Sequence, residues 1–203
     1  MEIEPEKYLS FELGNDENWT GNVESIPKNI NEYINITCLE VGHNRISILP
    51  EIIGNLKKLE EVYINNNLIK DIPKSIGQLK KLEILTINDN PIKSLPNELS
   101  GCTKLENFAA INCKLTQLPE EFGKLKNLEV LLLNHNQLSD LPKSISSLKN
   151  LYRLELENNK LKELPSCISN LTNLKQLNIS GNFIDKLELE KLRKSLPNCV
   201  IKN

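Results

Sequence analysis

Hydrophobic residues recur along this chain with a constant step of 23 residues. A frame of the form LxxLxLxxNxI begins at Ile36 and returns at Leu59, Leu82, Leu105, Leu128, Leu151 and Leu174. Within each frame apolar and polar positions alternate, which is the period-two signature of a strand with one buried face. A constant repeat of this length predicts a solenoid, in which each unit buries its apolar side against its neighbours.

A Leu-Pro or Ile-Pro dipeptide accompanies the frame at the same step. The prolines are Pro27, Pro50, Pro73, Pro96, Pro119, Pro142 and Pro165. Proline fixes φ and has no N–H, so the chain cannot continue a strand ladder through these positions and turns there. Two further apolar residues, for example Ile53 and Leu56, lie between most of the prolines and the next frame. The return segment is therefore expected to close the core from the side opposite the strands.

The frame places seven parallel strands in register. They are expected to centre on Cys38–Val41, Glu61–Ile64, Ile84–Ile87, Asn107–Ala110, Val130–Leu133, Arg153–Leu156 and Gln176–Ile179. The ninth frame position carries Asn44, Asn67, Asn90, Asn136, Asn159 and Asn182, with Cys113 in the remaining unit. A buried amide at this turn can bridge backbone groups of adjacent units, and leaving such groups unpaired costs about 1–3 kcal/mol each. These asparagines are therefore predicted to be structural.

The combined pattern LPxxIGxLxxLxxLxLxxNxI resembles the leucine-rich repeat family, in particular its 23-residue class from Ras-group-related intracellular proteins and bacterial proteins. The resemblance covers about residues 23–187. It implies an α/β fold, namely a leucine-rich repeat solenoid or horseshoe with a concave parallel β-sheet and a mostly irregular convex face. It also implies a role in binding other proteins.

The ends of the chain depart from the pattern. Residues 1–30 are expected to form an N-terminal cap in which Leu9, Phe11 and Leu13 alternate as in a strand, with Trp19 in a loop. Residues 31–187 hold the seven repeats, and residues 188–203 are expected to form a C-terminal cap. In that cap Glu188–Leu196 has the apolar spacing of an amphipathic helix and is followed by a last short strand. These parts together predict one continuous, complete domain.

Charge and cysteine content narrow the class of protein. The 203 residues carry 25 Lys and Arg against 27 Asp and Glu, a net charge of −2, which gives no basic field for nucleic acid or an anionic membrane. The first residues lack the layout of a signal peptide. The five cysteines show no CxxC spacing, so we expect five free thiols and a cytoplasmic location.

Catalytic chemistry is not indicated. The two histidines, His43 and His135, occupy the same frame position four units apart, roughly 19 Å at the spacing of β-strands, too far to share a metal ion. None of the common nucleotide-binding, hydrolase or metal-binding motifs is present. We therefore predict that the chain is not an enzyme and holds no cofactor or metal.

The outward positions of the predicted strands give the candidate binding site. Frame positions three, five and seven face outward, and their apolar members gather in the second to fifth units. With the charged residues on either side, the predicted site is Glu61, Tyr63, Ile84, Ala109, Ile111, Val130, Leu132, Arg153 and Glu155. An apolar centre with a charged rim is the anatomy of a protein interface, although a few exposed aliphatic residues are normal on any sheet.

These observations predict a monomeric, non-enzymatic module that binds a protein or peptide on its concave sheet, with no nucleic-acid or membrane partner. Two alternatives remain open at this point. The chain could be the inhibitor or targeting subunit of an enzyme in another chain, or a secreted adhesion protein that contacts host surfaces.

Overall fold

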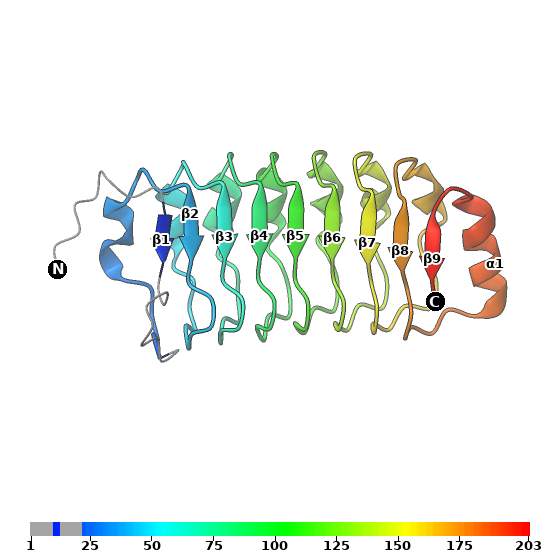
Figure 1. Cartoon of the computed structure of the whole chain (residues 1–203), viewed down its shortest axis with the longest axis horizontal. Helices are drawn as coiled ribbons and strands as arrows, with labels where there is room; N and C mark the ends of the chain where they lie inside the picture. Colours follow the sequence, from blue (N-terminus) through cyan, green and yellow to red (C-terminus); the bar gives the residue numbers. More distant parts are fainter. Residues whose placement is uncertain (1–9, 13–21) are drawn as a thin grey trace.

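The computed structural model describes residues 10–12 and 22–203, which form one row of parallel strands backed by short helices (Figure 1). The sheet has nine strands in the order of the sequence. They are β1 Ser10–Glu12, β2 Cys38–Glu40, β3 Glu61–Tyr63, β4 Ile84–Thr86, β5 Asn107–Ala109, β6 Val130–Leu132, β7 Arg153–Glu155, β8 Gln176–Asn178 and β9 Val200–Lys202. The seven predicted strands are confirmed as β2–β8.

The register follows directly from the constant repeat. From β2 to β8 each residue lies beside the residue 23 positions later, for example Leu85 beside Phe108 and Leu131 beside Leu154. Strand β1 extends the sheet before β2 and pairs Phe11 with Leu39. Most of the expected N-terminal cap, including Leu9, Leu13 and Trp19, lies outside the described residues.

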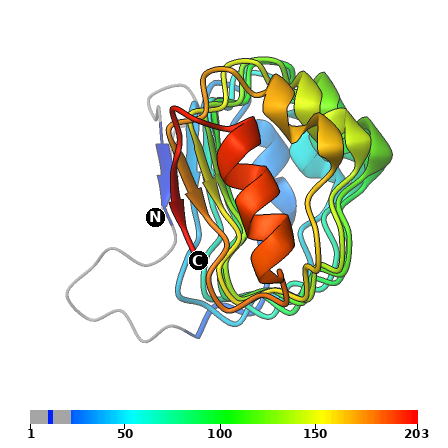
Figure 2. The ribbon, with the colours of Figure 1, turned by 90° about the vertical axis from the view of Figure 1, so that its right-hand side faces the viewer.

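Short 3-10 helices line the side opposite the sheet, as the end view in Figure 2 shows. They are η1 Lys28–Glu32, η2 Glu51–Asn55, η3 Lys74–Gln78, η4 Asn97–Gly101, η5 Glu120–Lys124, η6 Lys143–Ser147 and η7 Ser166–Asn170. Each begins directly after a proline, whose carbonyl accepts a hydrogen bond from the N–H three residues later, as between Ile53 N and Pro50 O at 3.0 Å. Each unit thus carries one five-residue 3-10 helix on its convex side, and the rest of that side is irregular, as the sequence predicts.

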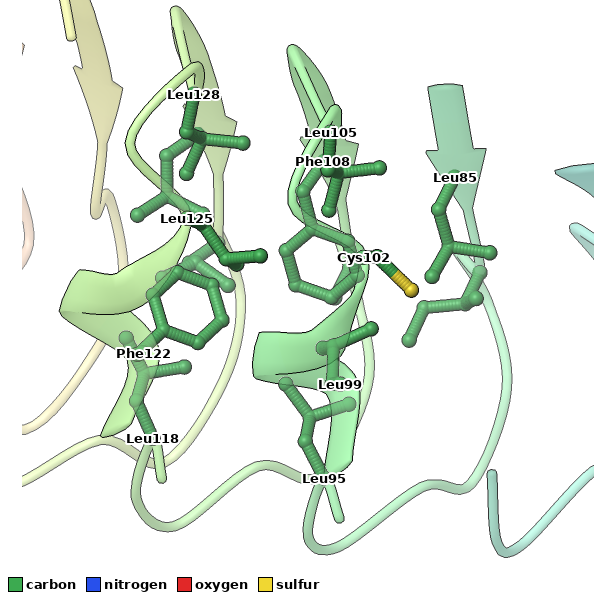
Figure 3. Packing of buried hydrophobic residues seen from close by; sticks show 14 of the residues in the cluster. Leu85, Leu95, Leu99, Cys102, Leu105, Phe108, Leu118, Phe122, Leu125 and Leu128 are labelled. Carbon is green, nitrogen blue, oxygen red and sulfur yellow. The ribbon is translucent and has the colours of Figure 1, made fainter. Parts of the chain in front are cut away.

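Leucine and isoleucine side chains fill the space between sheet and 3-10 helices. Two aromatic residues, Phe108 from β5 and Phe122 from η5, pack in the middle with their ring centroids 5.9 Å apart (Figure 3). Cys102 takes the place of a core leucine and is fully buried. Burying one such aliphatic side chain contributes about 1.5–3 kcal/mol, so the repeats are held together chiefly by this shared core.

The buried asparagines link adjacent units, as predicted. Asn90 Oδ1 accepts from Ile69 N at 3.0 Å in the preceding unit, and its Nδ2 donates to Ile64 O at 2.9 Å and Ile87 O at 3.1 Å. The same pattern recurs at Asn67, Asn136, Asn159 and Asn182. Cys113 occupies this position once, and its Sγ contacts Ile87 O in the preceding unit at 3.3 Å and Ile111 O in its own unit at 3.7 Å.

The helix α1, Lys186–Ser195, covers the C-terminal end of the core and leads into β9 (Figure 2). It begins two residues before the predicted helix because Asp185 caps it, accepting from Glu188 N at 2.8 Å. Leu192 within the helix and Leu196 directly after it are buried. Among the described residues no helix is both long and apolar enough to span a bilayer. The division into caps and repeats at residues 30 and 187 stays a prediction.

Candidate functional site: the concave sheet face

The strands present alternate side chains to the core and to the outside. In β6, Leu131 is fully buried, whereas Val130 and Leu132 on either side of it point outward and are half-buried. The outward side chains of β2–β9 form one surface, here called the concave face. It is built from residues that contribute little to the core, so their identity is not dictated by folding.

The register gathers the predicted site residues into rows across the sheet. The first row is Glu61, Ile84, Asn107, Val130 and Arg153, and the second is Tyr63, Thr86, Ala109, Leu132 and Glu155. Ile111 follows β5 in a third row with Asn65 and Asn88, which are joined to it by hydrogen bonds from Asn88 N to Asn65 Oδ1 and from Ile111 N to Asn88 Oδ1. All nine predicted residues therefore lie on or directly beside strands β3–β7.

The apolar centre of this face exposes less surface than the sequence indicates. Ile84, Ile111, Val130 and Leu132 are each half-buried. Ala109 is only 7% exposed, since its single methyl lies in a row between Thr86 and Leu132. Ala109 therefore forms a low point in the apolar surface, and its larger neighbours supply most of the area that a partner could touch.

Tyr63 and Glu61 form a polar pair on the N-terminal side of the apolar centre. The Tyr63 hydroxyl donates to Glu61 Oε2 at 2.9 Å. Partial burial, this hydrogen bond and the negative charge of Glu61 raise the pKa of Tyr63 to about 12. The hydrogen bond joins the hydroxyl to Glu61, and the ring offers a flat apolar surface that a partner could contact.

A polar hollow adjoins the C-terminal side of the apolar centre. Its volume is about 490 Å³, and Arg153, Glu155, Asn134, Glu157 and Lys202 are among its walls. Arg153 Nε lies 2.9 Å from Glu155 Oε1, and Lys202 Nζ lies 3.9 Å from Glu157 Oε2. Asn134 Oδ1 is buried and, within residues 10–12 and 22–203, has no hydrogen-bond partner. An unpaired acceptor of this kind is costly unless a donor reaches it.

Three of these residues were missed by the sequence-based site. Asn134 and Glu157 occupy the seventh frame position, so the same frame contains the signal that would have found them. Lys202 comes from β9, beyond the last repeat, and no repeat pattern places it beside β7 and β8.

The structure offers no catalytic constellation in the part of the chain that it describes. No group of three or more His, Cys, Asp or Glu residues there could hold a metal ion. His43 and His135 are exposed turn residues with φ of 55° and 57°. Burial raises the pKa of the Cys102 thiol to about 12 and that of Cys113 to about 11, so neither is an activated nucleophile.

Comparison with protein families agrees with this fold. Residues 34–77, 57–115 and 110–196 each match family models described as leucine-rich repeats. The chain belongs to the leucine-rich repeat family, whose fold commonly serves as a protein–protein interaction module. None of the curated proteins matches the sequence.

Solved structures provide three informative neighbours. A leucine-rich repeat protein of Leptospira interrogans is 41% identical with a TM-score of 0.88, over 95% of this chain and 48% of that one. The ectodomain of the Arabidopsis thaliana receptor kinase GASSHO1/SCHENGEN3, in complex with CASPARIAN STRIP INTEGRITY FACTOR 2, is 31% identical with a TM-score of 0.73, over 79% of this chain and 20% of that one. The internalin InlF of Listeria monocytogenes shares the fold, at 23% identity and a TM-score of 0.81, over 95% of this chain and 54% of that one. This chain thus spans about half the length of the Leptospira protein.

Proposed function

We propose that this chain is a non-enzymatic interaction module that binds a protein or peptide on its concave face. The observation that carries this proposal is the apolar centre on strands β3–β6, made of outward side chains that the core does not require. Polar residues flank it on both sides, which is the arrangement of a protein interface. The Arabidopsis ectodomain, which was solved in complex with CASPARIAN STRIP INTEGRITY FACTOR 2, supports this type of function.

We also propose that the chain is a monomer and is located in the reducing cytosol. The structure, which describes all five cysteines, joins none of them in a disulfide, and disulfides are rare in that compartment.

The test is a pair of matched substitutions on the surface. Leu132→Asp places a carboxylate at the centre of the proposed contact without removing a core side chain. Desolvating that unpaired charge is expected to weaken binding by about 2 kcal/mol or more, roughly a thirtyfold loss of affinity. Ile48→Asp introduces the same charge at a side chain that is 71% exposed and outside the sheet, so it serves as the control.

The measurement is affinity capture from native lysate with the wild type and both variants, followed by identification and titration of the retained protein. Circular dichroism melting checks that both variants fold. Retention by wild type and Ile48→Asp with loss by Leu132→Asp is the expected result. Equal retention by Leu132→Asp and wild type would show that binding uses another surface.

A further inference from the structure

A column of glutamates runs along the edge of the sheet where the chain enters strands β3–β6. Glu60, Glu83, Glu106 and Glu129 each stand one residue before a strand. Backbone hydrogen bonds fix them beside one another, from Glu83 N to Glu60 O at 2.8 Å, from Glu106 N to Glu83 O at 2.9 Å and from Glu129 N to Glu106 O at 2.8 Å. The backbone positions of the four glutamates therefore repeat at the spacing of strands, about 4.8 Å.

No Lys or Arg among the residues that the structure describes forms an ion pair with this column. Within the described residues the ion pairs lie elsewhere, and none includes these four glutamates. Lys58, Lys81 and Lys104 stand two positions earlier, each separated from its glutamate by a buried leucine, and form no ion pair with it. Like charges in register on neighbouring strands are destabilising, so the fold maintains an unfavourable row of four negative charges.

The acidic column and the apolar centre cover the same four strands. The residue that precedes β2 is Thr37, and the residues that precede β7 and β8 are Tyr152 and Lys175, so the glutamates stop at both ends of β3–β6. The concave face adds two carboxylates at the N-terminal side, Glu40 and Glu61, that also lie outside any ion pair of the described residues. An occupant of β3–β6 thus meets an apolar strip with a continuous negative edge beside it. This combination excludes a phosphate backbone and favours a basic, amphipathic partner.

We propose that the occupant of the concave face is an amphipathic α-helix of a partner protein, with an apolar row on the centre of β3–β6 and a row of Lys or Arg along the glutamate column. This inference rests on the proposed function and specifies its partner. An α-helix rises about 5.4 Å per turn, so three turns span about 16 Å. Three strand intervals span about 14 Å. One basic side chain per turn can therefore meet one glutamate per strand.

An extended segment matches the column less well. Its side chains on one face repeat at about 6.7 Å, so three repeats span about 20 Å and leave the basic residues out of step with the glutamates. A helix also presents its apolar and basic rows on adjacent faces, as i, i+3, i+4 and i+7 positions. The apolar centre and the glutamate column also lie side by side, so a helix can contact both at once.

The experiment selects peptides without presupposing their chemistry. A displayed library of random peptides, each long enough for four helical turns, is selected on the full chain and counter-selected on Leu132→Asp. Selected peptides are synthesised, and their dissociation constants are measured by fluorescence anisotropy at low and moderate salt. The same titrations use the triple variant Glu83→Gln, Glu106→Gln, Glu129→Gln. A control triple variant, Glu120→Gln, Glu163→Gln, Glu190→Gln, makes the same charge change at exposed carboxylates away from the column.

The expected peptides carry Lys or Arg at three- and four-residue spacing, gain helical circular dichroism on binding and lose affinity as salt rises. They bind the column variant about tenfold more weakly, because three exposed ion pairs of ordinary strength amount to about one order of magnitude. The control variant stays within about twofold of wild type. Urea unfolding of the column variant is expected at the same or a higher midpoint, since repulsion has been removed.

The remaining outcomes separate this inference from the proposed function. Peptides that need Leu132 but lack basic residues, or bind the column variant normally, overturn the basic partner and leave concave binding intact. Peptides that still bind after a central proline substitution overturn the helix. A library that yields no peptide sensitive to Leu132→Asp overturns both proposals. A column variant that unfolds at a lower urea concentration would assign the glutamates a structural role instead.

Discussion

Replacing Asn90 by alanine tests how the repeats are joined. The side chain of Asn90 is 2% exposed and bridges the third unit to the second. Alanine removes one acceptor and one donor from the turn where the chain leaves the strand, but it leaves the leucine core intact. The substitution therefore isolates the polar contribution to the stacking of units.

The magnitude follows from the partners that are left behind. Ile69 N loses the acceptor Asn90 Oδ1, has no other among residues 10–12 and 22–203, and remains buried, which costs about 1–3 kcal/mol. Ile64 O retains the donor Asn67 Nδ2 at 3.2 Å, and Ile87 O retains Cys113 Sγ at 3.3 Å, so the carbonyls are weakened and not orphaned. The lost hydrogen bonds add about 1 kcal/mol, and we expect a total destabilisation of about 2–4 kcal/mol.

Urea unfolding followed by circular dichroism measures this free energy. Asn55→Ala is the matched control, because Asn55 is exposed in η2, and a surface substitution of this kind usually changes stability by less than about 0.5 kcal/mol. A loss for Asn90→Ala no larger than for Asn55→Ala would refute the assignment of the buried asparagines as the links between units.

Three further results are expected. Leu133→Ala deletes a fully buried side chain and should lower the free energy of unfolding by about 2–5 kcal/mol in the same urea assay, and a change below about 1 kcal/mol would contradict its core position. Because the pKa of Tyr63 is raised from 10.0 to about 12, its contribution to stability is fully present below pH 10 and is lost as the pH rises through about 12. The absorbance difference between wild type and Tyr63→Phe should show that ionisation near pH 12, and ionisation near 10 would remove the proposed pairing with Glu61. Cys102 and Cys113 should react with a thiol reagent far more slowly than the other cysteines in the native protein, whereas all five should react in denaturant, and fewer than five would reveal a disulfide.

The repeat made most of the fold predictable from the sequence. A constant step places equivalent residues side by side, so the positions of β2–β8 and the asparagine links followed from alternation and spacing alone. The 3-10 helices were harder to predict from the sequence, because each is only five residues long and contains too few turns to show a helical period. Only their starting prolines were visible in the sequence.

The sequence predicts which side chains of the candidate site point outward, but not how deeply each one is buried. Alternation tells which way Ala109 and Leu132 point, but it does not tell how far larger neighbours cover the smaller side chain. The polar hollow depends on Lys202, which the repeat frame does not reach. The glutamate column occupies the second frame position, which lies at the strand edge and not among the outward positions three, five and seven, so alternation alone does not indicate it.

Different positions of the same repeat contribute to stability and to the proposed binding. Leu131 and Leu133 face the core, and Leu132 between them faces outward, so the outward residue can change without altering the stacking of units. In a solenoid the stability is close to a sum of units and their neighbouring contacts, and each glutamate of the column subtracts from that sum through repulsion by the next. Folding therefore gives no reason for four such residues to coincide with the four strands of the apolar centre. A basic partner bound along β3–β6 gives that reason, because it turns the same four repulsive charges into contacts.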